Sequence, residues 1–141
     1  MPFSLTDEQR QVQDTIRRVA RDKVAPRAAA IDAEAAYPQD MFDLLCDLGL
    51  FTLPFPSEYG GAGSMLSACL AVEELCRVCY NTAYLLVVQW TPFSAILAGG
   101  REAQKKRLLP GPASGALRAP FSPPAAHRGP DVAGVHPTAR R

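Results

Sequence analysis

A cluster of prolines and glycines near the middle of the chain most constrains its fold. Pro54 and Pro56 forbid an α-helix there, because proline has no N–H to donate and its ring clashes with the preceding helical turn. The apolar residues 50–53 just before them are too few for a helix, so we expect them to cross the core in an extended form. Three glycines within residues 60–63 then allow the chain to reverse. The regular elements must therefore lie on either side of this segment.

Helices are expected on both sides, because apolar residues recur there at steps of three and four. Thr6 and Gln9 form a capping box at the start of the first helix, and Gly49 follows the second helix where a positive φ is favoured. The expected helices run from Thr6 to about Glu34 with an end or a kink at Pro26, from Pro38 to Leu48, from about Met65 to Tyr80, from Asn81 to an interruption at Pro92 with a further apolar turn up to Gly99, and from Arg101 to Leu109.

The predicted fold class is therefore all-α, a bundle of five or six helices over about residues 6–109. Its expected core positions are Val12, Ile16, Leu44, Leu48, Leu70, Val72, Leu75, Leu85 and Leu86.

The end of the chain has a different character. Seven of the thirteen prolines fall from Pro110 onward, with no helical period between them. Residues 117–121 could begin a strand, but Pro120 removes a hydrogen-bond donor from any sheet. We therefore expect a helical domain over residues 1–110 and a tail over residues 111–141 that is poorly ordered or forms a strand.

Composition excludes several functional classes. The net charge of +1 offers no basic face for nucleic acid, and no apolar run approaches the ~20 residues of a membrane span. The N-terminal residues have no apolar signal-peptide core and carry early acidic residues, unlike a transit peptide. We expect a cytoplasmic protein without a membrane span.

The cysteines allow two interpretations. Cys76 and Cys79 form a C-x-x-C, which can bind metal or perform redox chemistry, but no second C-x-x-C and no nearby histidine completes a zinc site. The favoured interpretation is one apolar helical stripe in which the thiols act as small core residues. This stripe comprises Met65, Cys69, Val72, Cys76 and Cys79, and we assign no metal ligand.

The adjacent carboxylates Glu73 and Glu74 also suggest acid–base chemistry at first sight. Neighbouring helix positions diverge by about 100°, so the two cannot face one substrate atom. We expect one to be solvated and the other to form an ion pair between helices. His127 and His136 lie in the tail without pocket-forming partners and are expected to be exposed.

Several motifs in a fixed order resemble one enzyme family. They are the helix start at residues 3–7, Leu48-Gly49-Leu50, Pro56-Ser57-Glu58-Tyr59-Gly60-Gly61-Ala62-Gly63, Val72-Glu73-Glu74-Leu75, Gly99-Gly100 before Gln104-Lys105, and Leu109-Pro110-Gly111-Pro112-Ala113-Ser114-Gly115. Together they are similar to the N-terminal domain of the acyl-CoA dehydrogenases and the start of the middle β-domain, over nearly the whole chain.

The resemblance implies an FAD-dependent oxidoreductase of fatty acid metabolism that acts on a CH–CH bond of an acyl-CoA thioester. In the family a glutamate removes the α-proton while a hydride leaves the β-carbon for the flavin. The wall of the acyl pocket would fall on Thr82, Ala83 and Leu86. Family members are homo-oligomers at full length, and in most branches the catalytic base would lie after Arg141, so no catalytic residue is assigned to this chain.

The flavin-contacting motif of the family should lie at residues 121–131, where the chain departs from the pattern. Phe121 and Ser122 would belong to the cofactor site, but Pro124 replaces the threonine that contacts the flavin ring and offers neither hydroxyl nor N–H. We therefore expect a truncated and divergent member that is inactive and binds no FAD alone. The alternative is a non-enzymatic helical interaction module derived from the family. The genomic sequence downstream of the last codon would distinguish the two, because an open frame encoding a β-domain favours the enzyme.

Overall fold

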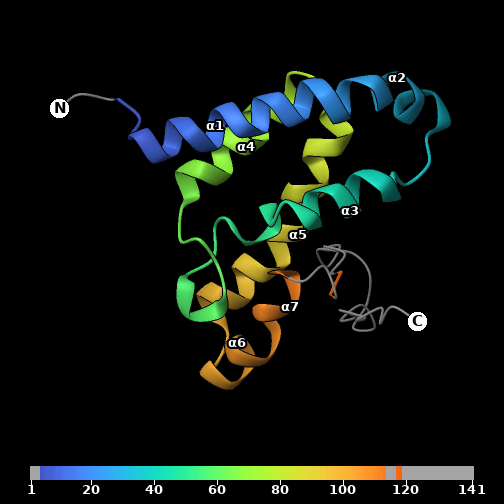
Figure 1. The fold of residues 1–141 in the computed structure, drawn as a ribbon. Helices are drawn as coiled ribbons and strands as arrows, with labels where there is room; N and C mark the ends of the chain where they lie inside the picture. Colours follow the sequence, from blue (N-terminus) through green and yellow to red (C-terminus); the bar gives the residue numbers. More distant parts are fainter. Residues whose placement is uncertain (1–3, 114–116, 119–141) are drawn as a thin grey trace, which may run out of the picture.

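The computed structural model describes residues 4–113 and 117–118, and its elements are all helical (Figure 1). In chain order they are α1 (Asp7–Val19), the π-helical turn η1 (Ala20–Val24), α2 (Ala25–Glu34), α3 (Gln39–Asp47), the 3-10 helices η2 (Leu50–Thr52) and η3 (Ser57–Tyr59), α4 (Met65–Cys76), α5 (Tyr80–Gly99), α6 (Glu102–Leu108) and α7 (Pro110–Ala113). The all-α fold class is confirmed for these residues. The predicted domain boundary at residues 110 and 111 falls inside α7 and stays a prediction, and the tail from residue 119 lies outside the described residues.

The first three elements form one continuous rod across the top of Figure 1. The capping box is present as predicted: Gln9 N–H donates to Thr6 Oγ1 at 3.2 Å, and Thr6 N–H donates to Gln9 Oε1 at 2.9 Å. Pro26 does not end the rod, because a π turn precedes it, in which Ala25 N–H donates to the Ala20 carbonyl. The wider turn gives the proline ring room where a regular helix would clash.

The connection between α3 and α4 folds back on itself. Gly49 has φ +67°, as predicted for the residue after a helix. The expected extended crossing over residues 50–53 is wrong: Leu50–Thr52 is a 3-10 helix in which Thr52 N–H and Oγ1 both donate to the Gly49 carbonyl. The positive φ at Gly49 starts this tight turn, and Leu50 and Phe51 are still buried.

Helix α5 runs unbroken to Gly99, so the predicted interruption at Pro92 is wrong. The expected third helix also ends earlier, at Cys76, and α5 already begins at Tyr80. Contacts on both sides of the buried Pro92 hold α5 in place. Trp90 Nε1–H donates to the Phe51 carbonyl at 3.0 Å. Phe93 meets Phe55 edge to face with ring centroids 6.4 Å apart. This packing outweighs the hydrogen bond that proline removes.

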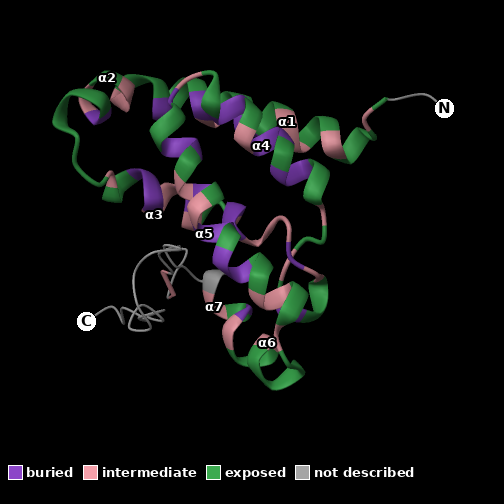
Figure 2. Ribbon diagram, turned by 180° about the vertical axis from the view of Figure 1, so that it is seen from behind, coloured by how far each residue is buried: buried purple, intermediate pink, exposed green. Residues whose placement is uncertain are grey.

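Helix α5 has the length and mean hydropathy of a membrane span, as core helices of water-soluble domains also do. It packs against α3, α4, α6 and η2, and its buried positions form the centre of the domain (Figure 2).

The predicted core positions are buried or partly buried, except for Leu48, which is exposed. Ile16, Leu70, Leu75 and Leu86 are buried, and Val12, Leu44, Val72 and Leu85 are partly buried. Leu48 is 39% exposed because it caps the C-terminus of α3 rather than continuing its buried face. That face consists of Met41, Phe42 and Leu45.

The predicted cysteine stripe on α4 is wrong as a core element. Cys69, Cys76 and Met65 are exposed, whereas Cys79 is buried at the start of α5 and Cys46 is partly buried on α3. Helix α4 lies against both α1 and α5, so it buries the opposite face. The buried residues of α4 are Ser67, Ala68, Leu70, Ala71, Glu74 and Leu75.

Candidate functional site

The residues predicted to wall an acyl pocket share one face of α5. Thr82, Ala83 and Leu86 all have 0% exposure, at positions one and four apart on the helix. The only polar group among them, the Thr82 hydroxyl, donates to Cys79 Sγ at 3.3 Å. What the face presents beyond that bond is methyl, methylene and isobutyl surface. These residues pack within the core of the domain and line neither of the two hollows described below, and the assignment to an acyl pocket stays a prediction.

A polar residue that the sequence reasoning missed lies along the same side of α5. Gln89 is three positions after Leu86, is 4% exposed, and donates its side-chain amide to the Leu117 carbonyl. The signal in the sequence was an amide at a core position of an otherwise apolar helix, where a polar group must find a hydrogen-bond partner. Gln89 thus joins α5 to the segment after α7.

Glu74 of α4 is, among the residues that the structure describes, the buried carboxylate, at 2% exposure. Arg17 of α1 donates from Nη2 to Glu74 Oε1 at 2.8 Å and from Nε to Oε2 at 3.1 Å, and Gln13 donates to Oε1 at 2.8 Å. The Arg17 hydrogen bond lowers the pKa of Glu74 against the opposing effect of burial, with Gln13 helping. A carboxylate with a lowered pKa and three donors is a poor proton acceptor, so Glu74 is a structural ion pair.

Glu73, its neighbour, behaves as the sequence predicted. It is exposed and pairs with Arg77 of the same helix at 2.7 Å. One carboxylate is thus solvated and the other joins two helices, which confirms the interpretation from helical geometry.

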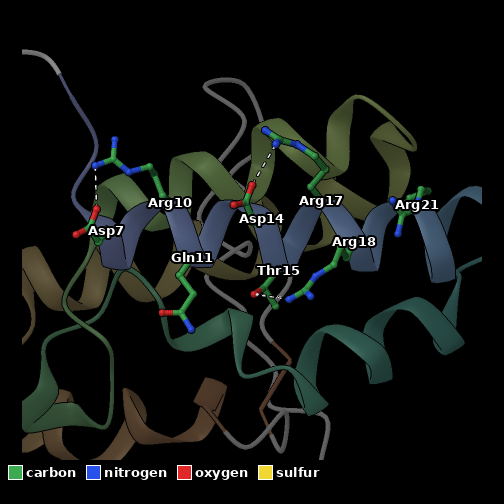
Figure 3. Close-up of a pocket in the computed structure, with 8 residues that line it drawn as sticks. All are labelled: Asp7, Arg10, Gln11, Asp14, Thr15, Arg17, Arg18 and Arg21. Carbon is green, nitrogen blue, oxygen red and sulfur yellow. Dashed lines mark hydrogen bonds and ion pairs between the residues drawn. The ribbon is translucent and has the colours of Figure 1, made fainter.

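A shallow hollow of about 560 Å³ lies along the charged face of α1 (Figure 3). Its arginines already have partners: Arg10 pairs with Asp7 at 3.0 Å, Arg17 pairs with Asp14 at 3.2 Å, and Arg18 donates to Thr15 at 3.4 Å. Arg21, at the end of the hollow, pairs with Asp22 at 2.7 Å. Three of the four arginines are paired with carboxylates, whereas Arg18 donates to a neutral hydroxyl, so little unpaired positive charge remains on this face.

A second hollow of about 300 Å³ is apolar and lies between α1 and the chain after α3. Its floor is formed by aliphatic residues, and the polar side chains of Gln11 and Thr15 also line it. The aliphatic residues are Val12, Ile16, Val19, Leu48, Leu50 and Leu53.

The remaining predicted positions fall elsewhere. Phe121, Ser122 and Pro124 of the cofactor motif, with His127 and His136, lie outside the described residues. Over residues 4–113 and 117–118, no group of three or more His, Cys, Asp or Glu side chains could hold a metal ion.

A flavin ring needs hydrogen bonds at its polar edge. The face of Thr82, Ala83 and Leu86 supplies a single hydroxyl that is already bonded to Cys79, so these residues do not fit that group.

Comparison with known proteins gives a consistent result. The sequence model of the family "Acyl-CoA dehydrogenase, N-terminal domain" matches residues 6–116. Cyclohexane-1-carbonyl-CoA dehydrogenase of Geobacter metallireducens is 41% identical over 112 residues, which is 77% of this chain and 29% of that protein. The short-chain specific acyl-CoA dehydrogenase of Clostridium acetobutylicum is 37% identical over 111 residues, which is 77% of this chain and 29% of that protein.

Among solved structures, butyryl-CoA dehydrogenase of Megasphaera elsdenii matches with a TM-score of 0.76 and 31% identity. The match covers 84% of this chain and 33% of that one. The chain thus spans less than a third of the length of these two curated relatives.

Proposed function

The chain belongs to the acyl-CoA dehydrogenase family, and from that premise we propose that it serves as the N-terminal helical domain of an FAD-dependent enzyme that desaturates an acyl-CoA thioester. The observation that carries the proposal is the match to the family's N-terminal domain over residues 6–116, together with the helical fold that the chain shares with butyryl-CoA dehydrogenase. The acyl-CoA substrates named for the relatives support the substrate class. We extend the proposal to a cytoplasmic homo-oligomer of fatty acid metabolism.

In this proposal α5 supplies surface rather than chemistry. Thr82, Ala83 and Leu86 are covered by the domain's own side chains, so they would reach an acyl chain only if their neighbours moved apart when the substrate binds. Bound FAD would supply the electron acceptor, and its site would be built largely by parts of the enzyme other than these residues.

We expect the isolated chain to be inactive. A cofactor as large as FAD needs a concave site that buries most of its surface. The apolar hollow beside α1 holds about 300 Å³, at the lower end of the range for small-molecule pockets, and has few polar groups. The flavin motif carries Pro124 where a hydrogen-bond donor would be needed.

A chimaera tests the proposal. Residues 6–116 of this chain would replace the matching N-terminal segment of the Megasphaera butyryl-CoA dehydrogenase, with flavin content and butyryl-CoA-dependent dye reduction measured. We expect a flavin-loaded, active chimaera. A folded chimaera that retains flavin but shows no acyl-CoA-dependent activity would overturn the proposal.

The same chimaera tests the acyl-pocket wall. Leu86→Ala would leave a cavity in the core, and where that cavity opens to the substrate the preference for longer acyl chains over butyryl-CoA should rise on the order of 10-fold. Leu85→Ala, on the neighbouring and only partly buried side of α5, is the matched control and should leave the preference unchanged. If the two variants had the same acyl-chain preference, the proposal that this face of α5 lines the acyl pocket would be wrong.

One observation favours the alternative of a non-enzymatic interaction module. Met65 and Leu66 on α4 are 60% and 47% exposed, and Tyr80 and Tyr84 on α5 are 63% and 48% exposed. Tyr80 and Tyr84 stack on one another with ring centroids 5.5 Å apart, and adjoining exposed apolar side chains can mark an interaction surface. An inactive chimaera together with a monodisperse, stable isolated chain would favour this alternative.

A further inference from the structure

The segment after α7 returns to the helical domain and packs on it. Leu117 N–H donates to the Gly111 carbonyl at 3.4 Å, and the Leu117 carbonyl accepts from the buried Gln89 amide. A Cβ on Gly111 would overlap Leu117 Cδ1, so a larger residue there would require the leucine side chain to shift. Leu117 is partly buried against the core. The N–H, the carbonyl and the side chain of Leu117 are therefore all held by the helical domain.

Arg118, the next residue, lies against aromatic rings of α3 and the turn before it. Its guanidinium carbon is 4.1 Å from the centroid of the Phe42 ring and 5.5 Å from that of Tyr37. Phe42 is 2% exposed, and Phe51 supports it with ring centroids 4.9 Å apart. A planar guanidinium over a supported aromatic ring is a favourable cation–π arrangement.

The surroundings of Arg118 distinguish this contact from an ion pair. Its Nε is buried and has no hydrogen-bond partner, and among the described residues no carboxylate pairs with the guanidinium. The ring faces are therefore the main attraction that holds this charge. Burial of part of the guanidinium strengthens the attraction to the rings, because water competes less.

We propose that the rings of Tyr37 and Phe42, together with the Gln89 amide, form a clasp that holds Leu117–Arg118 and so fixes the direction in which the chain leaves the helical domain. The clasp joins segments more than 70 residues apart in the sequence, from α3 to the exit. It does not depend on the proposed function, because it acts in the same way in an enzyme and in an interaction module.

Limited digestion with trypsin tests the clasp, because trypsin must take the arginine side chain into its specificity pocket to cut the bond between Arg118 and Ala119. The initial rate at which the fragment ending at Arg118 appears would be followed by mass spectrometry on the full chain. A synthetic peptide of residues 114–122 gives the rate for an unclasped site. We expect the wild-type chain to be cut roughly 30-fold more slowly than the peptide, which is the factor that corresponds to a desolvated cation–π contact.

Variants of the clasp should speed this cleavage. Tyr37→Leu and Phe42→Leu should raise the rate roughly 3- to 30-fold, with Phe42→Leu the larger because its ring lies nearer. Tyr84→Leu replaces a tyrosine of similar exposure away from the clasp and should leave the rate unchanged. Thermal melts identify any variant that unfolds. If Phe42→Leu unfolds, the cleavage rate of Tyr37→Leu alone tests the proposal. Equal rates for the wild type, Tyr37→Leu and the peptide would overturn the proposal.

Discussion

Arg17 of α1 binds both carboxylate oxygens of Glu74 on α4, although Arg17 is 52% exposed and Glu74 only 2%. The pair spans the interface between two helices that are 57 positions apart in the chain at this point. A bidentate contact of this kind admits one register of α1 on α4, because the planar guanidinium must meet the carboxylate edge to edge. The exposed Arg17 supplies the positive charge, and the buried Glu74 fixes where on α4 that charge must bind.

Loss of the buried carboxylate should be costly. Glu74→Ala removes the acceptor for Arg17 and Gln13 and leaves a small cavity, so the free energy of unfolding should fall by about 2–4 kcal/mol. Chemical denaturation followed by circular dichroism measures the change. Glu73→Ala is the matched control, because Glu73 is exposed on the adjacent position, and it should change stability by less than about 0.5 kcal/mol. Similar losses in both variants would contradict the structural role of Glu74.

The same residue predicts how stability depends on pH. The pKa of Glu74 is lowered in the folded state, chiefly by the Arg17 hydrogen bond, so the unfolded chain binds protons more readily in the acid range. The stabilisation is therefore complete above the ordinary glutamate pKa of 4.5 and is lost as the pH falls through the lower folded value.

Denaturation at pH values from 7 down to 3 checks this sign. The difference in stability between wild type and Glu74→Gln should shrink as the pH falls below about 4.5. The pKa of Asp40 is lowered by Arg27 in the same way. Because Asp40 titrates equally in both proteins, its contribution cancels from the comparison. A difference that grows in acid would show that Glu74 does not carry the effect.

Gly61 should not tolerate a side chain. A Cβ there would collide with the carbonyl oxygen and the carbonyl carbon of Phe55, both of which are backbone atoms. Gly61→Ala should therefore lower the free energy of unfolding by about 1–3 kcal/mol or prevent folding. Gly99→Ala, where a Cβ meets nothing within 4 Å, is the control and should be neutral or slightly stabilising. Thermal melts of the two variants decide, and an unperturbed Gly61→Ala variant would contradict the packing of the loop.

The isolated chain should bind neither FAD nor acyl-CoA. FAD needs a concave site that buries most of its surface. The hollow of about 560 Å³ is shallow and lined by charged and polar side chains of α1 and η1, and the apolar hollow holds only about 300 Å³. The candidate acyl face also offers no free hydrogen-bond donor. Titration of the purified chain with FAD, followed by flavin absorbance and fluorescence, should give no saturable change. Saturation in the low micromolar range would contradict this prediction, and the active chimaera serves as the positive control.

Local signals in the sequence predicted local structure well. Three such predictions are confirmed: the capping box at Thr6, the positive φ at Gly49, and the exposure of Glu73 beside a Glu74 that pairs with another helix. Each depends on interactions within about one helical turn, or on helical geometry alone.

The errors arose where packing overrides local preference. Pro92 lies inside an unbroken α5 because Trp90 and Phe93 anchor the helix on either side. The cysteine stripe has helical spacing, but α4 buries its other face because both α1 and α5 pack there. Periodicity alone did not identify which face of a largely apolar helix meets its neighbours.

The candidate site was predicted only in part. The sequence, through its family resemblance, assigned Thr82, Ala83 and Leu86, and the structure places them together on a buried face. It did not identify Gln89, because the partner of that amide is the carbonyl of Leu117, 28 positions later in the chain. Contacts of such separation are fixed by the folded chain and leave little trace in local spacing.

The hydrogen bond from Trp90 to the Phe51 carbonyl also places an intrinsic fluorophore at a contact inside the domain. Trp90 is the sole tryptophan of the chain, so the indole emission comes from one position. That indole is 9% exposed and lies where α5 meets the 3-10 turn after α3. Its spectrum is therefore sensitive to the separation of these two elements, and rapid-mixing experiments can time their association without any attached dye.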